Sequence, residues 1–206
     1  MNDDAKNFKE TFPGWDDYYK DNDVKSMPWY EEKLDHDLEN ELNTRSLNSG
    51  NFLDLGTGPG TQAIQLSNYG FDVTGTDISN SAIERAKKLS DKIDFLVDDI
   101  LDSKFPDKKF DYIFDRGVFH VFEKDQRAQY LSQIKRILNE NGILFLKCMS
   151  KEEKNLPDDG MPHKFSKQDI EDFFNSDFEI QKISTSIFKG TLDEFPKALF
   201  SVLKKK

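Results

Sequence analysis

The chain has 206 residues, of which 36% are hydrophobic and 33% charged, and its formal net charge is −10. This length is enough for one domain with a substantial core, and the 18 Phe residues argue against a disordered chain. The negative charge disfavours nucleic acid as a partner, because the only basic cluster is the terminal Lys204, Lys205 and Lys206.

The single cysteine, Cys148, excludes an intrachain disulfide and suits a reducing compartment. No apolar run reaches the length of a membrane span, and the polar residues 1–4 do not resemble a signal peptide. The three histidines are scattered, without the Cys/His spacing of a metal site. We therefore expect a cytoplasmic protein with no membrane contact and no bound metal.

The N-terminal part of the chain is predicted to form a cap on the rest. Residues 1–24 are polar and aromatic without clear periodicity, whereas leucines recur at helical spacing over residues 34–42. We expect a single domain in which residues 1–45 make a helical cap segment and residues 46–206 make the core.

From residue 51 onward, apolar strand patterns alternate with helical patterns. This alternation predicts an α/β fold with a doubly wound, Rossmann-like, mostly parallel sheet and right-handed crossovers. Ser79 and Ser166 are suited to cap two of the helices, and Asn141-Gly142 is suited to end a third. The predicted strands cover residues 51–55, 71–76, 93–97, 110–114, 143–148, 178–188 and 198–203, and the predicted helices cover 61–69, 79–89, 123–139 and 166–175.

A glycine-rich loop follows the first strand, in the pattern Asp54-x-Gly56-x-Gly58-x-Gly60. Glycines without a Cβ allow a sharp turn and a close approach of a ligand to the backbone. The free N–H groups at the start of the next helix favour a carboxylate or phosphate. The dinucleotide fingerprint would need a third glycine where Thr61 stands, so the spacing argues against NAD or FAD.

Acidic residues follow the second and third strands. Asp77 ends the second strand about 20 residues into the unit, where a carboxylate can accept hydrogen bonds from both ribose hydroxyls. Asp98 and Asp99 follow the third strand and can accept from an adenine amino group, while Ile100 packs on the ring. The first strand thus ends in a glycine loop, and the second and third strands end in acidic residues. This arrangement predicts a nucleoside site at the carboxyl edge of the sheet.

These features resemble the class I S-adenosylmethionine-dependent methyltransferases over roughly residues 25–204. Their first motif looks like Asp54 to Gly60, their ribose acid matches Asp77, and their adenine-side acid matches Asp99. The resemblance implies a methyltransferase of the EC 2.1.1 type with S-adenosyl-L-methionine as cofactor and S-adenosyl-L-homocysteine as product. It also implies a C-terminal antiparallel strand pair. The implied cofactor-binding residues are Trp29, Asp54, Gly56, Thr57, Gly58, Gly60, Asp77, Ile78, Asp98, Asp99, Ile100 and Asp115.

A looser resemblance points to the small-molecule methyltransferases of the thiol, thiopurine and tellurite-resistance type. It rests on residues 114–122 and on Pro28-Trp29. Trp29 would then cover the cofactor, since an aromatic face attracts a sulfonium cation, or it is a core aromatic. The implied substrate-contacting residues are Arg116, Phe119 and His120.

Several of these residues keep two interpretations. His120 would remove a proton from the acceptor or hold it, or would only satisfy a hydrogen bond after a strand. Asp115 would touch the cofactor or pair with Arg116, and Arg116 would orient an acidic acceptor or form a structural salt bridge. Tyr18 and Tyr19 fit a cofactor cover less well than a core position.

We expect a small-molecule acceptor, with a thiol or other soft nucleophile favoured. A thiol has a reference pKa of about 8.5 and needs only modest activation, whereas an alcohol needs a base or a metal. Two alternatives are a methyltransferase acting on a protein side chain and a non-catalytic S-adenosylmethionine sensor. The sequence leaves monomer and homodimer open.

Overall fold

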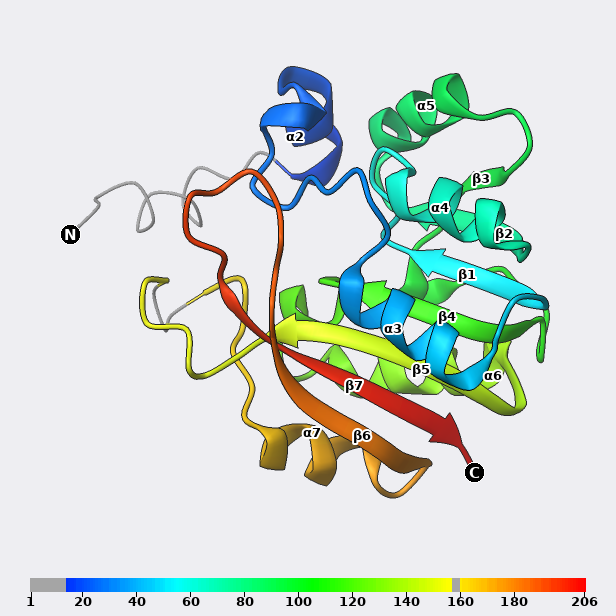
Figure 1. Ribbon diagram of the computed structural model, residues 1–206, viewed down its shortest axis with the longest axis vertical. Helices are drawn as coiled ribbons and strands as arrows, with labels where there is room; N and C mark the ends of the chain where they lie inside the picture. Colours follow the sequence, from blue (N-terminus) through cyan, green and yellow to red (C-terminus); the bar gives the residue numbers. More distant parts are fainter. Residues whose placement is uncertain (1–13, 157–159) are drawn as a thin grey trace.

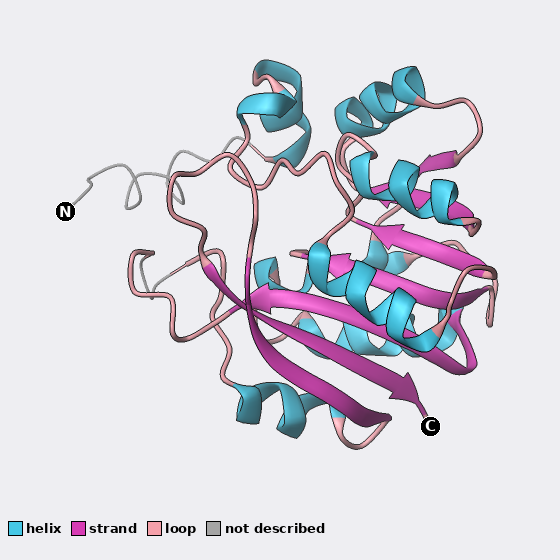
Figure 2. Cartoon of the chain, viewed as in Figure 1, coloured by secondary structure: helices cyan, strands magenta, loops and turns pink. Residues whose placement is uncertain are grey.

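The computed structural model describes residues 14–156 and 160–206 (Figure 1). A seven-stranded sheet with the order β3-β2-β1-β4-β5-β7-β6 lies at the centre, and helices cover both of its faces (Figure 2). Strands β1 to β5 pair in parallel, and β7 is antiparallel to both β5 and β6. The predicted doubly wound sheet and its C-terminal antiparallel pair are confirmed.

The strands and helices follow one another in the predicted alternation. None of the helices in the described part of the chain has the length and apolar character that crossing a membrane requires.

The strands are β1 Asn51–Leu55, β2 Asp72–Asp77, β3 Asp94–Val97, β4 Phe110–Arg116, β5 Leu138–Met149, β6 Phe178–Ile187 and β7 Lys197–Lys205. The α-helices are α2 Trp15–Asp21, α3 His36–Arg45, α4 Thr61–Tyr69, α5 Asn80–Leu89, α6 Arg127–Ile137 and α7 Lys167–Phe174, and the 3-10 helices are η1 Val24–Ser26, η2 Ile100–Asp102 and η3 Phe119–Val121.

Both predicted serine caps are present. The Ser79 hydroxyl accepts a hydrogen bond from the amide N–H of Ala82 at 3.0 Å and so begins α5. The Ser166 hydroxyl accepts from the N–H of Asp169, whose carboxylate in turn accepts from the N–H of Ser166, which makes a capping box at α7. Short polar side chains before apolar helical patterns are therefore sufficient to locate these helix starts.

One helix differs from the prediction at both ends, and one helix was not predicted. Helix α6 begins at Arg127 instead of residue 123 and ends at Ile137 instead of residue 139, because Leu138 already pairs with Phe110 as the first residue of β5. The prediction that Asn141-Gly142 ends this helix is wrong, because both residues lie within β5. Helix α2 was not predicted, since its seven residues have no apolar period. It is held in place by a contact distant in the sequence, in which the Asp16 carboxylate accepts hydrogen bonds from the Ser79 hydroxyl and the Ser81 N–H at 3.0 and 2.7 Å.

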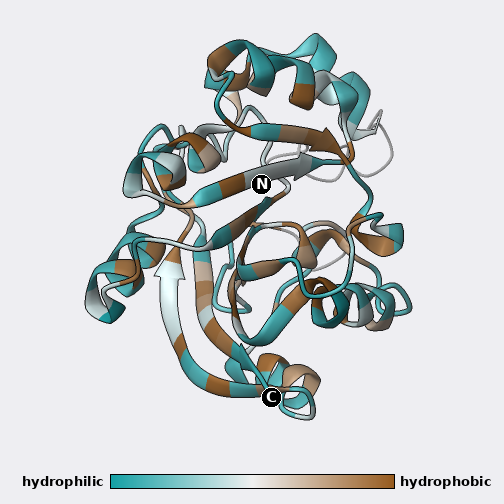
Figure 3. Ribbon diagram, turned by 90° about the vertical axis from the view of Figure 1, so that its right-hand side faces the viewer, coloured by the Kyte–Doolittle hydropathy of each residue, from teal (hydrophilic) through white to brown (hydrophobic). Residues whose placement is uncertain are grey.

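Two hydrophobic clusters fill the space between the sheet and its helices. Side chains alternate along β1, so Phe52 packs toward α3 and α4 while Leu53 and Leu55 pack toward α6. Figure 3 shows hydrophobic residues recurring along the strands and the helices, with hydrophilic residues between them. Helix α3, which we expected in the cap, buries Leu38 and Leu42 in the core. Residues 1–13 of the predicted cap lie outside the described residues.

Candidate active site

The glycine loop lies where the strand order of the sheet reverses. Strands β1 and β4 are neighbours with helices on opposite faces, and Leu55 pairs with Asp115 at their carboxyl ends. Such a switch point leaves a crevice that binds ligands in open α/β sheets. Gly56, Gly58 and Gly60 have φ values of 70°, 53° and 85°, which other residues adopt only with strain. The loop therefore has the sharp turn that the sequence predicts.

Two buried carboxylates flank this loop. The Asp77 carboxylate accepts hydrogen bonds from the N–H groups of Gly58 and Ser79, both at 2.9 Å, and so joins the loop to the start of α5. Burial raises the pKa of Asp77 to about 6, although the backbone N–H groups oppose the shift. Asp54 accepts from the Thr57 hydroxyl at 2.6 Å, and burial raises its pKa to about 6 as well. Both carboxylates can change charge near neutral pH.

The third strand end presents a mixed surface. Asp99 caps η2 by accepting from the N–H of Leu101 at 2.9 Å, and Asp98 accepts from the N–H of Lys104 at 3.0 Å. Ile100, which we expected to pack on the adenine ring, is buried in the core cluster next to α6, and its contact with the ring stays a prediction. Ile78, directly after Asp77, is 55% exposed although it is apolar. An exposed apolar side chain beside a buried carboxylate and near Asp99 fits a purine ring next to its ribose.

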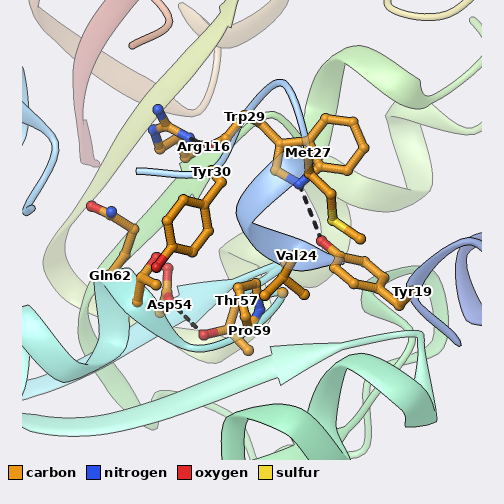
Figure 4. A pocket seen from close by; sticks show the side chains of 13 residues that line it. Tyr19, Val24, Met27, Trp29, Tyr30, Asp54, Thr57, Pro59, Gln62 and Arg116 are labelled. Atoms are coloured by element: carbon orange, nitrogen blue, oxygen red, sulfur yellow. Dashed lines mark hydrogen bonds between the residues drawn. The ribbon is translucent and has the colours of Figure 1, made fainter. Parts of the chain in front are cut away.

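Residues 22–35, a shorter part of the predicted cap, cross over the glycine loop, and from here on the term cap segment means these residues (Figure 4). Trp29 donates from Nε1 to the Tyr19 hydroxyl at 3.3 Å. That hydroxyl lies against the loop, because a Cβ on Gly58 would be 2.7 Å away from it. Tyr19 has the core position that we preferred, because it is buried in a small cluster with Met27 and Ala82, and it also lines the site. A cavity of about 40 Å³ lies between cap and loop, lined by Tyr19, Val24, Met27, Trp29, Tyr30, Asp54, Gly56, Thr57, Gly58, Pro59, Thr61, Gln62 and Arg116.

Helix α4 fixes the cap segment from below. The Gln62 side chain accepts from the N–H of Asp35 at 2.8 Å and donates to the carbonyls of Lys33 and Glu31 at 2.9 and 3.2 Å. Because α4 starts at the glycine loop, one helix positions both the loop and the segment above it.

Arg116, at the end of β4, connects three separate parts of the chain. Its Nε donates to the Asp35 carboxylate at 3.0 Å, its Nη1 to the Trp29 carbonyl at 2.9 Å and its Nη2 to the Lys189 carbonyl at 2.6 Å. The sequence left open whether Arg116 forms a structural salt bridge, and the structure shows one between Arg116 and Asp35. Arg116 also lines the cavity, and these bonds use three of the five N–H groups of its guanidinium.

Lys147 lies completely buried in β5, and its charge is matched by α3. Its ammonium donates to both Asp35 oxygens at 2.9 and 2.7 Å and lies 2.8 Å from Asp37. Burial alone would raise the pKa of Asp35, but the charges of Lys147 and Arg116 hold that pKa below its usual value. Asp35, His36 and Asp37 bring metal-ligand atoms together, but the cations of Lys147 and Arg116 already bind the carboxylates. The sequence signal we overlooked is a lysine inside an otherwise apolar strand.

The loop between β6 and β7 closes the site from the other side (Figure 1). The N–H and hydroxyl of Thr191 donate to the carbonyls of Pro28 and Met27 at 3.2 and 3.0 Å. A Cβ on Gly190 would lie only 1.9 Å from the Pro28 oxygen, so this approach requires glycine. We call residues 27–30 and 188–191 together the roof of the site.

Asp115 lies under the site and not in its cavity. It pairs with Leu55 and, like Leu55, faces α6. Its carboxylate accepts from the Tyr130 hydroxyl at 2.7 Å and from the N–H groups of residues 117–119. These bonds hold the turn after β4, and a contact between Asp115 and the cofactor stays a prediction.

Phe119 and His120 leave this turn in different directions. Phe119 is fully buried among the rings of Tyr130, Phe165, Phe173 and Phe174. His120 accepts a hydrogen bond at Nδ1 from the N–H of Met149 at 3.1 Å, and its ring centroid lies 5.5 Å from that of Phe188 in the roof. Of the three predicted substrate-contacting residues, the structure brings Arg116 into the cavity and His120 against the roof.

Comparisons with known proteins agree with this geometry. A family model described as a methyltransferase domain matches residues 52–142. An uncharacterized methyltransferase of Schizosaccharomyces pombe is 30% identical over 109 residues, which cover 51% of this chain and 75% of that protein. The chain belongs to the S-adenosylmethionine-dependent methyltransferases. This methyltransferase is thus an enzyme whose cofactor is S-adenosylmethionine, and the glycine loop, Asp77 and the exposed Ile78 fit that group.

Individual relatives of the methyltransferase differ in their printed activities. A probable thiol methyltransferase of Arabidopsis thaliana is 27% identical over 77% of this chain and 70% of its own length. An EEF1A lysine methyltransferase of Danio rerio is 24% identical over 62% of this chain and 60% of its own length. A solved structure described as "Conversion of a Disulfide Bond into a Thioacetal Group during Echinomycin Biosynthesis" has a TM-score of 0.78 and 26% identity. It covers 96% of this chain and 92% of its own.

Proposed function

We propose that this methyltransferase transfers the methyl group of S-adenosylmethionine to a small molecule, with a thiol or another soft nucleophile as the acceptor. When bound, the cofactor supplies a methyl group that is already activated on a sulfonium sulfur. The protein then has mainly to align the two reactants, which accounts for about 7–11 kcal/mol of the barrier in well-oriented systems.

The cofactor roles follow the three strand ends. Asp77 would accept from the ribose hydroxyls, Ile78 would pack on the adenine ring, and Asp99 would accept from the adenine amino group. Asp54 and the N–H groups at the start of α4 would hold the two ends of the methionine part. Trp29 would cover the sulfonium through its ring, and Tyr19, bonded to it, would complete the cover.

The observation that carries the small-molecule proposal is the roof. Two segments far apart in the sequence meet above the end of β4, and Arg116 binds both of them through the carbonyls of Trp29 and Lys189. The cavity beneath residues 27–30 measures about 40 Å³, and its lining includes the aromatic side chains of Tyr19, Trp29 and Tyr30. A small thiol fits such an enclosed site better than a side chain that has to enter with its own protein attached.

A protein acceptor is the second candidate, because the lysine methyltransferase named above matches 62% of this chain. The net charge of −10 would attract a basic protein, so electrostatics do not oppose this function. An exposed lysine would, however, have to reach the methyl group past the roof.

A methyl-transfer screen separates the two candidates. The full chain is incubated with labelled S-adenosylmethionine and, in parallel, with small thiols, amines, phenols and purified basic proteins. We expect labelled thioethers from one or more thiols and little transfer to protein. Transfer confined to protein lysines would refute the small-molecule proposal. Asp77→Ala serves as the control, because it must abolish transfer to any acceptor at low cofactor concentration.

A further inference from the structure

The imidazole of His120 is fixed by the backbone of a neighbouring strand. The N–H of Met149, at the end of β5, donates to Nδ1 at 3.1 Å. A ring nitrogen that accepts a hydrogen bond carries no proton, so in the neutral imidazole the proton sits on Nε2. The backbone therefore selects one tautomer.

The surroundings of His120 keep the ring neutral. The backbone N–H of His163 donates to the His120 carbonyl at 2.7 Å, and the Arg116 guanidinium packs on the same Phe188 ring as the His120 imidazole. Burial, together with the positive potential from His163 and Arg116, lowers the pKa of His120 to about 3. A ring that does not take up a proton at physiological pH can donate from Nε2 but cannot accept at Nδ1 from a substrate.

The Nε2–H group belongs to a ring that packs against Phe188 of the roof. Among the described residues, no group accepts a hydrogen bond from Nε2–H. Nε2 is also not fully enclosed by protein atoms. Gly117 leaves it uncovered, because a Cβ there would lie 3.2 Å from Nε2. The His120 ring and the Arg116 guanidinium both pack on Phe188, the latter at 5.6 Å. His120 thus shares the acceptor side of β4 with Arg116.

The nearby groups that would be alternative bases are already engaged. The Asp115 carboxylate accepts four hydrogen bonds, three from backbone N–H groups and one from the Tyr130 hydroxyl. Cys148 is fully buried on the face of the sheet that packs against α6. The acceptor side therefore offers donors, and the described residues around His120 supply no free proton acceptor.

Building on the proposed function, we propose that His120 holds the methyl acceptor through its Nε2–H and does not deprotonate it. The enzyme would then select acceptors that arrive as anions, thiolates above all. The thiolate sulfur supplies the electron pair of the new S–CH3 bond. The bond between the methyl carbon and the cofactor sulfur breaks, its electrons stay on that sulfur, and no proton moves.

The pH dependence of kcat/KM for small thiols of different pKa tests the kinetic part. We expect the inflection to follow the pKa of each thiol, about 8.5 for a simple alkyl thiol. His120→Ala should lower kcat/KM roughly 10- to 100-fold, as expected for a hydrogen bond to a charged group, without moving the inflection. His120→Asn should recover most of the loss, because its amide can both accept from Met149 and donate. One inflection shared by all thiols and absent in His120→Ala would overturn the proposal.

The tautomer is measured independently by ¹⁵N NMR of the histidine-labelled protein, with no acceptor present. We expect a His120 signal of the neutral Nε2–H form that does not change from about pH 8 to about pH 5. A proton on Nδ1, or titration near the ordinary value of about 6.5, would contradict the inference. If the wild type methylates no thiol, the proposed acceptor class fails, while the NMR result still decides whether His120 is a neutral Nε2–H donor and not a base.

Discussion

The two sides of the active site are built in different ways. On the cofactor side, the glycine loop, Asp77 and Asp99 each lie directly after a strand, so the parallel sheet alone brings them together. On the acceptor side, the cap segment, Arg116, Lys147 and the β6–β7 loop meet only through contacts distant in the sequence. The cofactor side is thus a property of the fold, whereas the acceptor side depends on a few specific bonds.

This difference indicates where the two sides can vary. A change in the β6–β7 loop can reshape the acceptor space without moving the cofactor residues at the three strand ends. The proteins that this chain resembles are named as thiol and as lysine methyltransferases, so their printed acceptors differ. Each of the following variants is aimed at one side only.

Lys147→Met should have the largest effect, because it leaves the Asp35 carboxylate buried without its main cation. Removing one partner of a buried pair costs about 3–5 kcal/mol of unfolding free energy. Chemical denaturation measures the loss. Lys182→Met is the matched control, since its ion pair with Glu41 is half exposed and should contribute no more than about 1 kcal/mol. A loss for Lys147→Met as small as that of the control would show that Lys147 does not anchor the cap.

Asp77→Ala should have the next largest effect and act on the cofactor side. Hydrogen bonds to a charged group contribute about 1.5–3 kcal/mol each, so loss of the ribose contacts should weaken binding roughly 100-fold. Calorimetry with S-adenosyl-L-homocysteine measures the affinity. Asp72→Ala, on the exposed end of the same strand, should bind like the wild type. Equal affinity of Asp77→Ala and the wild type would remove Asp77 from the site.

The same contrast explains what the sequence could predict. The glycine spacing, the acids after β2 and β3 and the Ser79 cap are local patterns, and each was found where it was expected. The roof had no such pattern, because Gly190 and Pro28 are 162 residues apart and only the folded chain brings them into contact. Helix α2 was missed for the same reason. Its sequence has no helical period of apolar residues, and the hydrogen bonds of Asp16 to the start of α5 hold it in place.

Gly190→Ala should affect the acceptor side more than the cofactor side. The new methyl group would overlap the Pro28 carbonyl and separate the two halves of the roof, with loss of the Thr191 hydrogen bonds. We expect the acceptor KM to rise about tenfold, in line with one or two lost hydrogen bonds, and the cofactor Kd, which depends on the roof only through Trp29, to change much less. Steady-state kinetics and calorimetry measure the two constants. Leu192→Ala, exposed in the same loop, is the control. A parallel change in both constants would show that the two sides are not separable.

The smallest expected effect is the pH dependence of cofactor binding. The carboxylate form of Asp77 accepts the ribose hydroxyls, so protonation below its pKa of about 6 should weaken binding. Affinity should be constant above about pH 7 and about fourfold lower at about pH 5.5, since one competing proton changes Kd tenfold per pH unit below the pKa. Asp77→Asn should flatten this acid limb. An unchanged slope in that variant would assign the titration to another group, such as Asp54, whose pKa is also about 6.

A crystal structure with S-adenosyl-L-homocysteine bound tests most directly whether the ends of three strands hold the cofactor while the roof encloses the acceptor. The account predicts ribose hydroxyls on the Asp77 carboxylate, adenine against Ile78, and the homocysteine sulfur directed toward Arg116 beneath the roof. Ligand density away from the glycine loop, or a ribose turned away from Asp77, would contradict it.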